Sequence, residues 1–196
     1  MIKITDSRRL KMKKAIAILL MLIAFGWLYS QSGNHSELKE GDVVFQISES
    51  KQSPLIAAAT GSQWTHCGVI VMKKGEPYVL EASSVVKLTP WEQWKQRGKG
   101  GITSMKRYTD KPVKIRYSQY LGKPYDLAFK FDNGKWYCSE LVYDIYLKQL
   151  GVKLCEPRPI SDYHLVGMDK TMRRRGISRD QLAVAPVDLF DSKQLH

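Results

Sequence analysis

The sequence predicts an α+β fold in which a small antiparallel sheet packs against helices. Three segments, 42–47, 66–72 and 77–82, are rich in β-branched and aromatic residues, as strands are. The second and third are joined by the turn sequence KKGE, which predicts a hairpin. A long amphipathic helix is expected only later, after residue 136, so strands come first and the main helix follows.

Two short helices are predicted from their N-terminal sequences. Ser53 is placed as the N-cap of the first, with Pro54 at its first helical position. Thr89 is placed as the N-cap of the second, where Glu92 completes a capping box and Gly98 ends the helix.

The rest of the chain is predicted less regularly. After Gly98 we expect a loop of glycine and lysine, then strands near 103–108 and 112–116. The segment around Pro124 is turn-rich, and the chain after Gly151 is loop-rich with short helical pieces.

The first 32 residues are predicted to be a signal peptide or a signal anchor. The first 14 residues contain six bases, and the next 15, Ala15 to Tyr29, carry no charge. Both alternatives send the rest of the chain outward, to the periplasm or the outer face of a bacterial cytoplasmic membrane, and residues 15–29 would be the anchor. A buried core helix is the other interpretation. Residues 33–41 are expected to be a tether and 42–196 a single domain.

The net charge of the 196-residue chain is +12. For an exported protein this favours an anionic envelope surface as a partner, and nucleic acid is not predicted. The run Arg173 to Arg175 is either such a contact or an ordinary solvated face.

The three cysteines are Cys67, Cys138 and Cys155, so at least one thiol is unpaired within the chain. Cys67 and Cys155 are candidates for pairing. The sequence has no CxxC motif, and its four histidines are scattered, so neither a metal nor another cofactor is predicted.

Cys138 stands at the start of the predicted amphipathic helix. Leu141, Val142 and Ile145 continue its stripe at helical spacing, and Gly151 is the expected stop. A cysteine there is either a small core residue or a thiolate nucleophile stabilised by the helix N-terminus. The spacing leaves both interpretations open.

A candidate base and its orienting group lie in the predicted hairpin. A turn centred on Lys74–Gly75 pairs His66 with Ser83, and Glu81 is then the diagonal neighbour on the same face. The carboxylate would orient the imidazole and raise its pKa. A surface cross-strand pair is the alternative.

The neighbours of His66 have predicted roles as well. Gly68 shares the face of His66 and would leave room for a helix end to approach. Cys67 points to the opposite face and is expected in the core. His164 is a rival base with no carboxylate placed beside it by local geometry.

Several motifs together resemble the permuted NlpC-type papain-like cysteine hydrolases of the YiiX/YebB-like branch. They are GDVVFQIS, THCGVIV, PYVLEASSVVKLTPWEQWKQRG, YLGKPYD and WYCSELVYDIY, which together span roughly residues 41–151. The histidine precedes the cysteine, as in the circularly permuted branch.

The resemblance implies a permuted papain-like fold with a small, barrel-like antiparallel sheet. It implies Cys138 as nucleophile, His66 as base and then acid, and Glu81 as the orienting group. Tyr125, in GKPYD, matches a tyrosine near the active site of such enzymes and would help the Cys138 N–H to bind an oxyanion.

One departure from the ordinary NlpC pattern lies at the cysteine. The usual D-C-S-G is replaced by Tyr137-Cys138-Ser139-Glu140, which fits the permuted branch but leaves the specificity open. Glu140 is expected in a structural ion pair near the helix start, with substrate binding as the alternative.

The expected function is therefore that of an exported cysteine hydrolase. Its substrate would be an amide bond in peptidoglycan stem peptides or another N-acyl amide. A thiol acyltransferase or lipid hydrolase at the membrane, similar to lecithin:retinol acyltransferase, is a second hypothesis. A non-catalytic module that binds the cell wall is a third.

Overall fold

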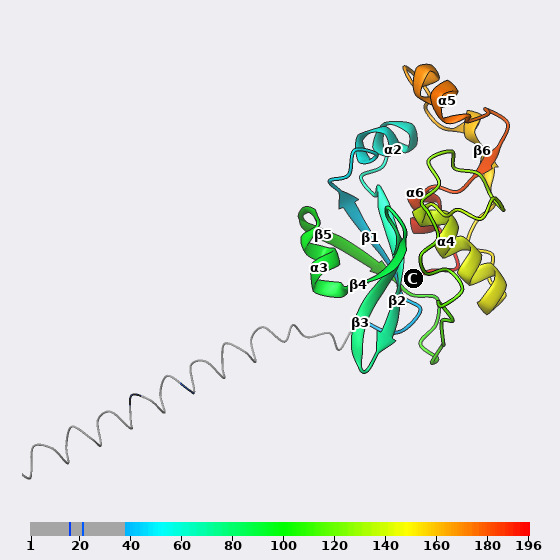
Figure 1. Cartoon of the computed structure of the whole chain (residues 1–196). Helices are drawn as coiled ribbons and strands as arrows, with labels where there is room; N and C mark the ends of the chain where they lie inside the picture. The colour runs from blue at the N-terminus through cyan, green and yellow to red at the C-terminus, as the bar shows by residue number, and fades with distance from the viewer. Residues whose placement is uncertain (1–15, 17–20, 22–37) are drawn as a thin grey trace, which may run out of the picture. The chain divides into compact units, whose positions relative to one another are not determined.

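The folded domain begins at Leu38 in the computed structural model of the chain (Figure 1), which describes residues 16, 21 and 38–196. The sequence prediction had placed its start at residue 42. Leu38 packs on the hydrophobic cluster around Trp94, and the Gly41 N–H donates to the Ile70 carbonyl. The predicted signal segment and residues 33–37 lie outside the described part, apart from the two isolated positions. Within the described residues, no helix is long and apolar enough to cross a membrane.

A five-stranded antiparallel sheet forms the centre of this domain, in the order β4-β3-β2-β1-β5. This confirms the predicted α+β class, but the sheet is open, with β4 and β5 as its edges, and the expected barrel-like closure is absent from the described residues. The strands are β1 (Val43–Ser48), β2 (His66–Lys73), β3 (Glu76–Ala82), β4 (Val86–Pro90) and β5 (Gly98–Lys106).

The hairpin of β2 and β3 has the predicted register. Lys73 pairs with Glu76 and Val69 with Leu80 across a two-residue turn. Lys74 and Gly75 both have positive φ, 54° and 84°, which is the backbone that a tight hairpin turn of this twist requires. This register places Glu81 on the face of His66.

The strand predicted near 103–108 is the end of β5, which begins at Gly98. The expected glycine-lysine loop is therefore part of a strand, paired to β1. Residues 112–116 form no strand; the Ile115 N–H donates instead to Glu40 Oε1.

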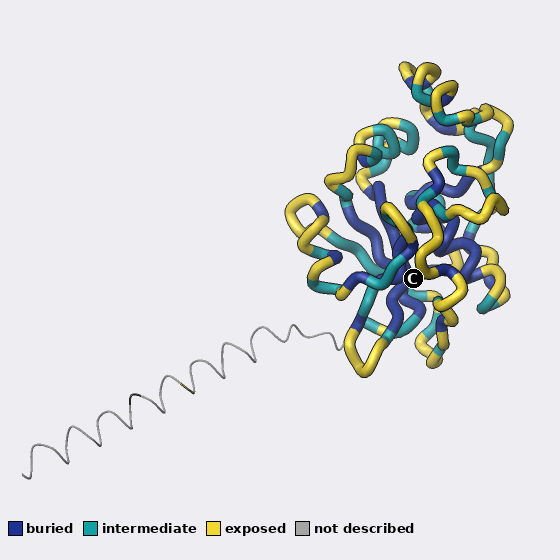
Figure 2. The backbone as a smooth tube through the Cα atoms, viewed as in Figure 1, coloured by how far each residue is buried: buried dark blue, intermediate teal, exposed yellow. Residues whose placement is uncertain are grey.

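The two faces of the sheet bury different clusters. One face, with Cys67, Val69 and Leu80, packs against α4 (Cys138–Ile145). The other face carries Ile70 and packs against α3 (Trp91–Gln96) through Trp94. In Figure 2 the buried backbone runs through β1–β3 and α4.

The two short helices form, but their predicted caps are wrong. α2 (Ser53–Thr60) includes Ser53, whose hydroxyl bonds to Thr65 Oγ1 and does not cap the helix. Thr89 belongs to β4, because its hydroxyl donates to Glu81, and α3 begins after Pro90.

The helix α4 continues as a five-residue π-helical turn, Tyr146–Leu150, and ends at Gly151, as predicted. Gly151 has φ 68°, a left-handed backbone that glycine adopts without strain. All eight side chains of α4 are buried, so α4 is a central element of the domain.

The chain after Gly151 covers the start of α4. Ser139 Oγ donates to the Val184 carbonyl at 2.7 Å, and the Val184 N–H donates to the Tyr137 hydroxyl at 3.2 Å. The elements of this tail are β6 (Arg158–Pro159), a 3₁₀ turn (Ile160–Asp162), α5 (Asp169–Arg175), β7 (Leu182–Ala183) and α6 (Pro186–Phe190).

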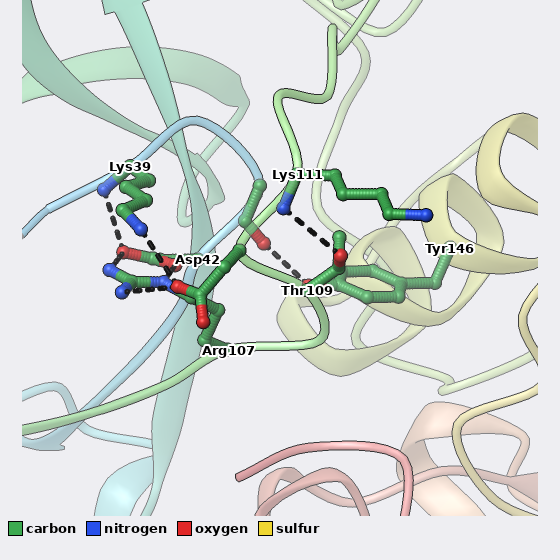
Figure 3. A network of polar contacts seen from close by, with 8 residues as sticks. Lys39, Asp42, Arg107, Thr109, Lys111 and Tyr146 are labelled. Carbon is green, nitrogen blue, oxygen red and sulfur yellow. Dashed lines mark hydrogen bonds and ion pairs between the residues drawn. The ribbon is translucent and has the colours of Figure 1, made fainter.

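An ionic network centred on the buried Asp42 ties the start of β1 to the end of β5 (Figure 3). Arg107 donates from Nε and Nη2 to the two oxygens of Asp42, at 2.7 and 2.8 Å. The Lys39 backbone N–H also donates to Asp42, and its ammonium pairs with Asp110. The Tyr146 hydroxyl donates to the Gly41 carbonyl nearby, which attaches the helix α4 to the same corner.

Candidate active site

His66 and Glu81 form a buried pair on the face of the sheet that carries α3. His66 begins β2, and its Nε2 lies 2.6 Å from Glu81 Oε2 on β3. Nε2 is therefore engaged with the carboxylate, and Nδ1 is the nitrogen left to face another group. The hairpin register alone brought these two side chains together.

Glu81 has no exposed surface and is surrounded by donors. Thr89 Oγ1 and Arg97 Nη2 donate to Oε1, each at 2.5 Å, and Trp94 Nε1 donates to Oε2 at 3.1 Å. Burial alone would raise the pKa of Glu81, but the bond to His66 and those to Thr89 and Arg97 outweigh it and lower the pKa to about 2. The carboxylate is therefore ionised at neutral pH.

Sequence reasoning missed this cage around Glu81. It assigned Thr89 to a helix cap and gave Trp94 and Arg97 no role. A threonine two residues before a tryptophan-rich helix carries no mark of such a contact, since the contact depends on how β4 pairs with β3.

Cys138 occupies the first position of α4, beside His66 and Cys67. The hydrogen bond from the Cys67 thiol lowers the pKa of Cys138 most; burial opposes it, and His66 lowers it further. Burial would likewise lower the pKa of His66, but the bonds with Cys138 and Glu81 raise it to about 9. The lowered pKa of the thiol and the raised pKa of the imidazole both favour a thiolate beside an imidazolium.

Cys67 lies in the core, as predicted, but it also contacts Cys138. α4 packs against the face of Cys67. On the opposite face, the nearest neighbours of a side chain added at Gly68 belong to β3. A Cβ at Gly68 would lie 2.4 Å from Val79 Cγ1 and 2.7 Å from the Leu80 carbonyl oxygen. The glycine is needed because the neighbouring strand comes close.

Tyr125 is half-buried beside the Cys138 sulfur. Burial, followed by the negative charge and the hydrogen bond at Cys138, raises the pKa of Tyr125, so its hydroxyl keeps its proton. It can therefore donate a hydrogen bond to an anion next to the sulfur, which agrees with its expected position.

Glu140 is buried at the helix start and makes no ion pair among the described residues, contrary to the prediction. Its carboxylate accepts the Tyr137 N–H at 3.3 Å and so caps α4. Burial raises its pKa to about 8, assisted by the charges of Asp126 and Asp144. Glu140 is therefore largely protonated at neutral pH, which suits a cap away from solvent.

An apolar pocket opens beside Cys138 and encloses about 790 Å³, including its mouth. The tail after Gly151, which the sequence left without a role, forms most of its walls. The main apolar side chains in it are Leu55 and Ile56 of α2, and Tyr163, Met168, Met172 and Ile177 of the tail.

A second, polar pocket of about 1380 Å³ opens on the other side, beside His66. Its charged and hydroxyl side chains include Glu49, Ser83, Ser84, Lys87 and Arg97, besides Glu81 and His66 themselves. Gln52, Ile56 and Tyr125 line both pockets, so the two adjoin between Cys138 and His66.

The remaining candidates lie elsewhere. His164 is exposed, and its backbone N–H donates to the Ala59 carbonyl. Cys67 and Cys155 are both free thiols, so their pairing does not occur in this structure. Burial raises the pKa of Cys155 to about 12.

Comparison with known families gives one match over most of the chain. Residues 37–196 match a family of permuted papain-like amidases described as YaeF/YiiX, C92. The chain belongs to this family. It is therefore a papain-like hydrolase of the amidase type, and its fold is the permuted papain-like one that the resemblance implied.

Two relatives come from Escherichia coli. The uncharacterized protein YiiX of strain K12 is 33% identical over 199 residues, which cover 94% of each chain. The crystal structure of the metalloprotein YiiX from O157:H7 has a TM-score of 0.72 at 34% identity, covering 81% of this chain and 94% of that one. In the described part of this chain, no group of three or more His, Cys, Asp or Glu side chains fits a metal ion.

Proposed function

We propose that the chain hydrolyses an amide that joins an apolar acyl group to a polar amine, with Cys138 as nucleophile. The observation that carries this is the pair of pockets that adjoin at the thiolate: an apolar one beside Cys138 and a polar one beside His66. The acyl group stays on sulfur after the first step, whereas the amine leaves with a proton from the histidine.

The reaction then follows from the site. The Cys138 thiolate attacks the carbonyl carbon, and the Tyr125 hydroxyl and the Cys138 N–H bind the oxyanion. His66, held by Glu81, protonates the leaving amine. A water activated by the neutral His66 then releases the acid from the acyl-enzyme.

The apolar pocket favours an N-acyl amide over a peptidoglycan stem peptide, whose acyl side is polar. The same pocket is also compatible with the acyl-transfer hypothesis, because an acceptor other than water could take the acyl group from the same acyl-enzyme. The basic N-terminus and residues 15–29 support placing the enzyme outside the cytoplasmic membrane as part of the proposal.

The test is a series of N-acyl amides with one amine and chains of increasing length, given to the full-length protein and to Cys138→Ala. We expect kcat/KM to rise roughly fourfold per methylene until the pocket is filled. Mass spectrometry of the wild type should detect the acyl group on Cys138, and Cys138→Ala should be inactive.

Intact sacculi and a labelled acceptor are given to the same two proteins. Cys138-dependent release of muropeptides without any chain-length preference would restore the peptidoglycan hypothesis. Transfer of the acyl group to the acceptor would favour a transferase, and sacculus binding without any turnover would favour a non-catalytic module.

A further inference from the structure

The polar pocket contains an ammonium group that nothing in the described part of the protein neutralises. Lys87, on β4, is half-buried and lines this pocket. It is the direct cross-strand partner of Glu81, so the two side chains share a face of the sheet. The obvious counter-ion of Lys87 is therefore the carboxylate beside it.

Glu81 has no acceptor site left for Lys87. A carboxylate offers about four lone-pair positions. His66, Trp94, Thr89 and Arg97 donate to them, and all four donors lie within 3.1 Å. Lys87 thus lies beside a fully engaged anion and makes no ion pair of its own in the described chain.

A second unpartnered group lies at the same wall. The Ser83 hydroxyl oxygen is shielded from solvent and has no hydrogen-bond partner. The observed β2–β3 register, extended to the strand ends, sets Ser83 opposite His66. A buried polar atom without a partner costs free energy, which a ligand can recover by bonding to it.

The other charges around this pocket do not cancel Lys87. Arg97 is positive, and its side chain is 39% exposed beyond its bond to Glu81. The charges of Arg97 and His66 are offset by the Glu81 carboxylate and the Cys138 thiolate, so these four groups leave the charge of Lys87 uncancelled. Glu49 is the other carboxylate among the described lining residues, and it is exposed to water. The wall nearest His66 therefore presents cationic and hydroxyl groups.

We propose that Lys87 and Ser83 bind an anionic group carried by the leaving amine. This inference deepens the proposed function: its substrate class is an N-acyl amide with an apolar chain and an anionic amine, such as an N-acyl amino acid. The chain lies in the apolar pocket, the amide between Cys138 and His66, and the anion against Lys87. A carboxylate and a phosphate share this chemistry.

The test measures binding separately from turnover. In full-length Cys138→Ala at pH 7, we compare the Kd of N-octanoylglycine with that of neutral N-octanoylglycinamide. We expect the carboxylate to bind about tenfold more tightly, as a charge-assisted hydrogen bond at a half-buried site allows. N-octanoyl-O-phosphoethanolamine against N-octanoylethanolamine makes the same comparison for phosphate.

The matched variants assign the preference to Lys87. Adding Lys87→Gln should abolish it, and Lys87→Arg should retain it. Ser83→Ala should reduce it about threefold through one lost hydrogen bond. Lys111→Gln removes an exposed lysine that does not line this pocket, and should leave the preference unchanged.

Equal affinities for the anionic and neutral ligands, no binding of either, or a preference that survives Lys87→Gln would each overturn the inference. Wild-type turnover of both amides at one rate would overturn it while leaving the proposed function intact. An anion preference in Cys138→Ala without turnover by the wild type would overturn the proposed function and leave the anion site intact.

Discussion

Two buried carboxylates of this domain, Asp42 and Glu81, accept hydrogen bonds from arginine, yet they serve different ends. Asp42 is 1% exposed and accepts hydrogen bonds from Nε and Nη2 of Arg107 and from the Lys39 backbone N–H. None of these donors titrates near neutral pH. Glu81 is 0% exposed and holds His66, whose other nitrogen faces a thiol between two pockets. Burial of a charge therefore does not by itself indicate function, whereas a titratable partner beside the proposed nucleophile supports the proposed function.

The largest effect is expected at the histidine itself. His66→Ala should lower kcat/KM by roughly 10²–10⁴-fold, because it removes both the base and the acid. It should also raise the pKa of the Cys138 thiol toward that of a free cysteine, near 8.5. Alkylation rate against pH, with Cys67 and Cys155 changed to Ser, measures the thiol. An unchanged profile would mean that no thiolate–imidazolium pair exists.

The Cys67→Ser background needs its own control. Because Cys67 contributes to the lowered pKa of Cys138, its replacement can itself shift the titration. The same measurement with only Cys155 replaced separates the two contributions.

A smaller effect is expected when Glu81 loses its charge. Glu81→Gln should lower kcat/KM by about 10–100-fold, since it misorients His66 without removing it. In the wild type, the pKa of His66 is raised to about 9, and the Glu81 carboxylate is one cause of this. The substitution removes that cause. The basic limb of the kcat/KM profile should therefore move from about 9 to lower pH.

The pH shift separates orientation from folding. A Glu81 variant that is only less stable would have a lower kcat/KM at every pH, and the basic limb of its profile would stay near pH 9. That result would mean that Glu81, like Asp42, serves only to stabilise the fold.

The smallest effect on catalysis is expected at the comparison site. Asp42→Asn should lower the free energy of unfolding by about 3 kcal/mol, the low end for a broken buried ion pair, because Arg107 retains 16% exposure. It should change kcat/KM at 25 °C less than twofold. Urea denaturation and steady-state kinetics on one preparation measure both.

Asp110→Asn is the matched control, because it removes an exposed acceptor of the same network. It should change neither quantity noticeably. A large loss of activity in Asp42→Asn, with the fold intact, would show that the two carboxylates are coupled through the sheet.

The sequence by itself determined the hairpin and the stripe of α4. Period-two alternation and a two-residue turn fix which residues share a face, so His66 and Glu81 were predictable as neighbours. Helical spacing and Gly151 likewise placed Cys138 at a helix start. The order of histidine and cysteine indicated the permuted family before any coordinates.

Only the tertiary structure decided what surrounds these residues. Thr89 lies in β4, where its hydroxyl donates a hydrogen bond to the buried Glu81 carboxylate. It therefore does not cap α3, which has no side-chain cap. Glu140 accepts the Tyr137 N–H and so caps its own helix, and it makes no ion pair among the described residues. Packing with Cys67, Val69 and Leu80 places α4 on the face opposite to Gly68.

The pockets were beyond sequence reasoning for the same physical cause. Their walls join α2 to a tail more than a hundred residues later, and such non-local contacts leave no periodic trace in the chain. Lys87 makes no ion pair with the residues that the structure describes, because four other donors occupy the acceptor positions of Glu81. Local pattern determined which side chains could carry the chemistry, whereas long-range packing decided which groups face them, and so which substrate the site fits.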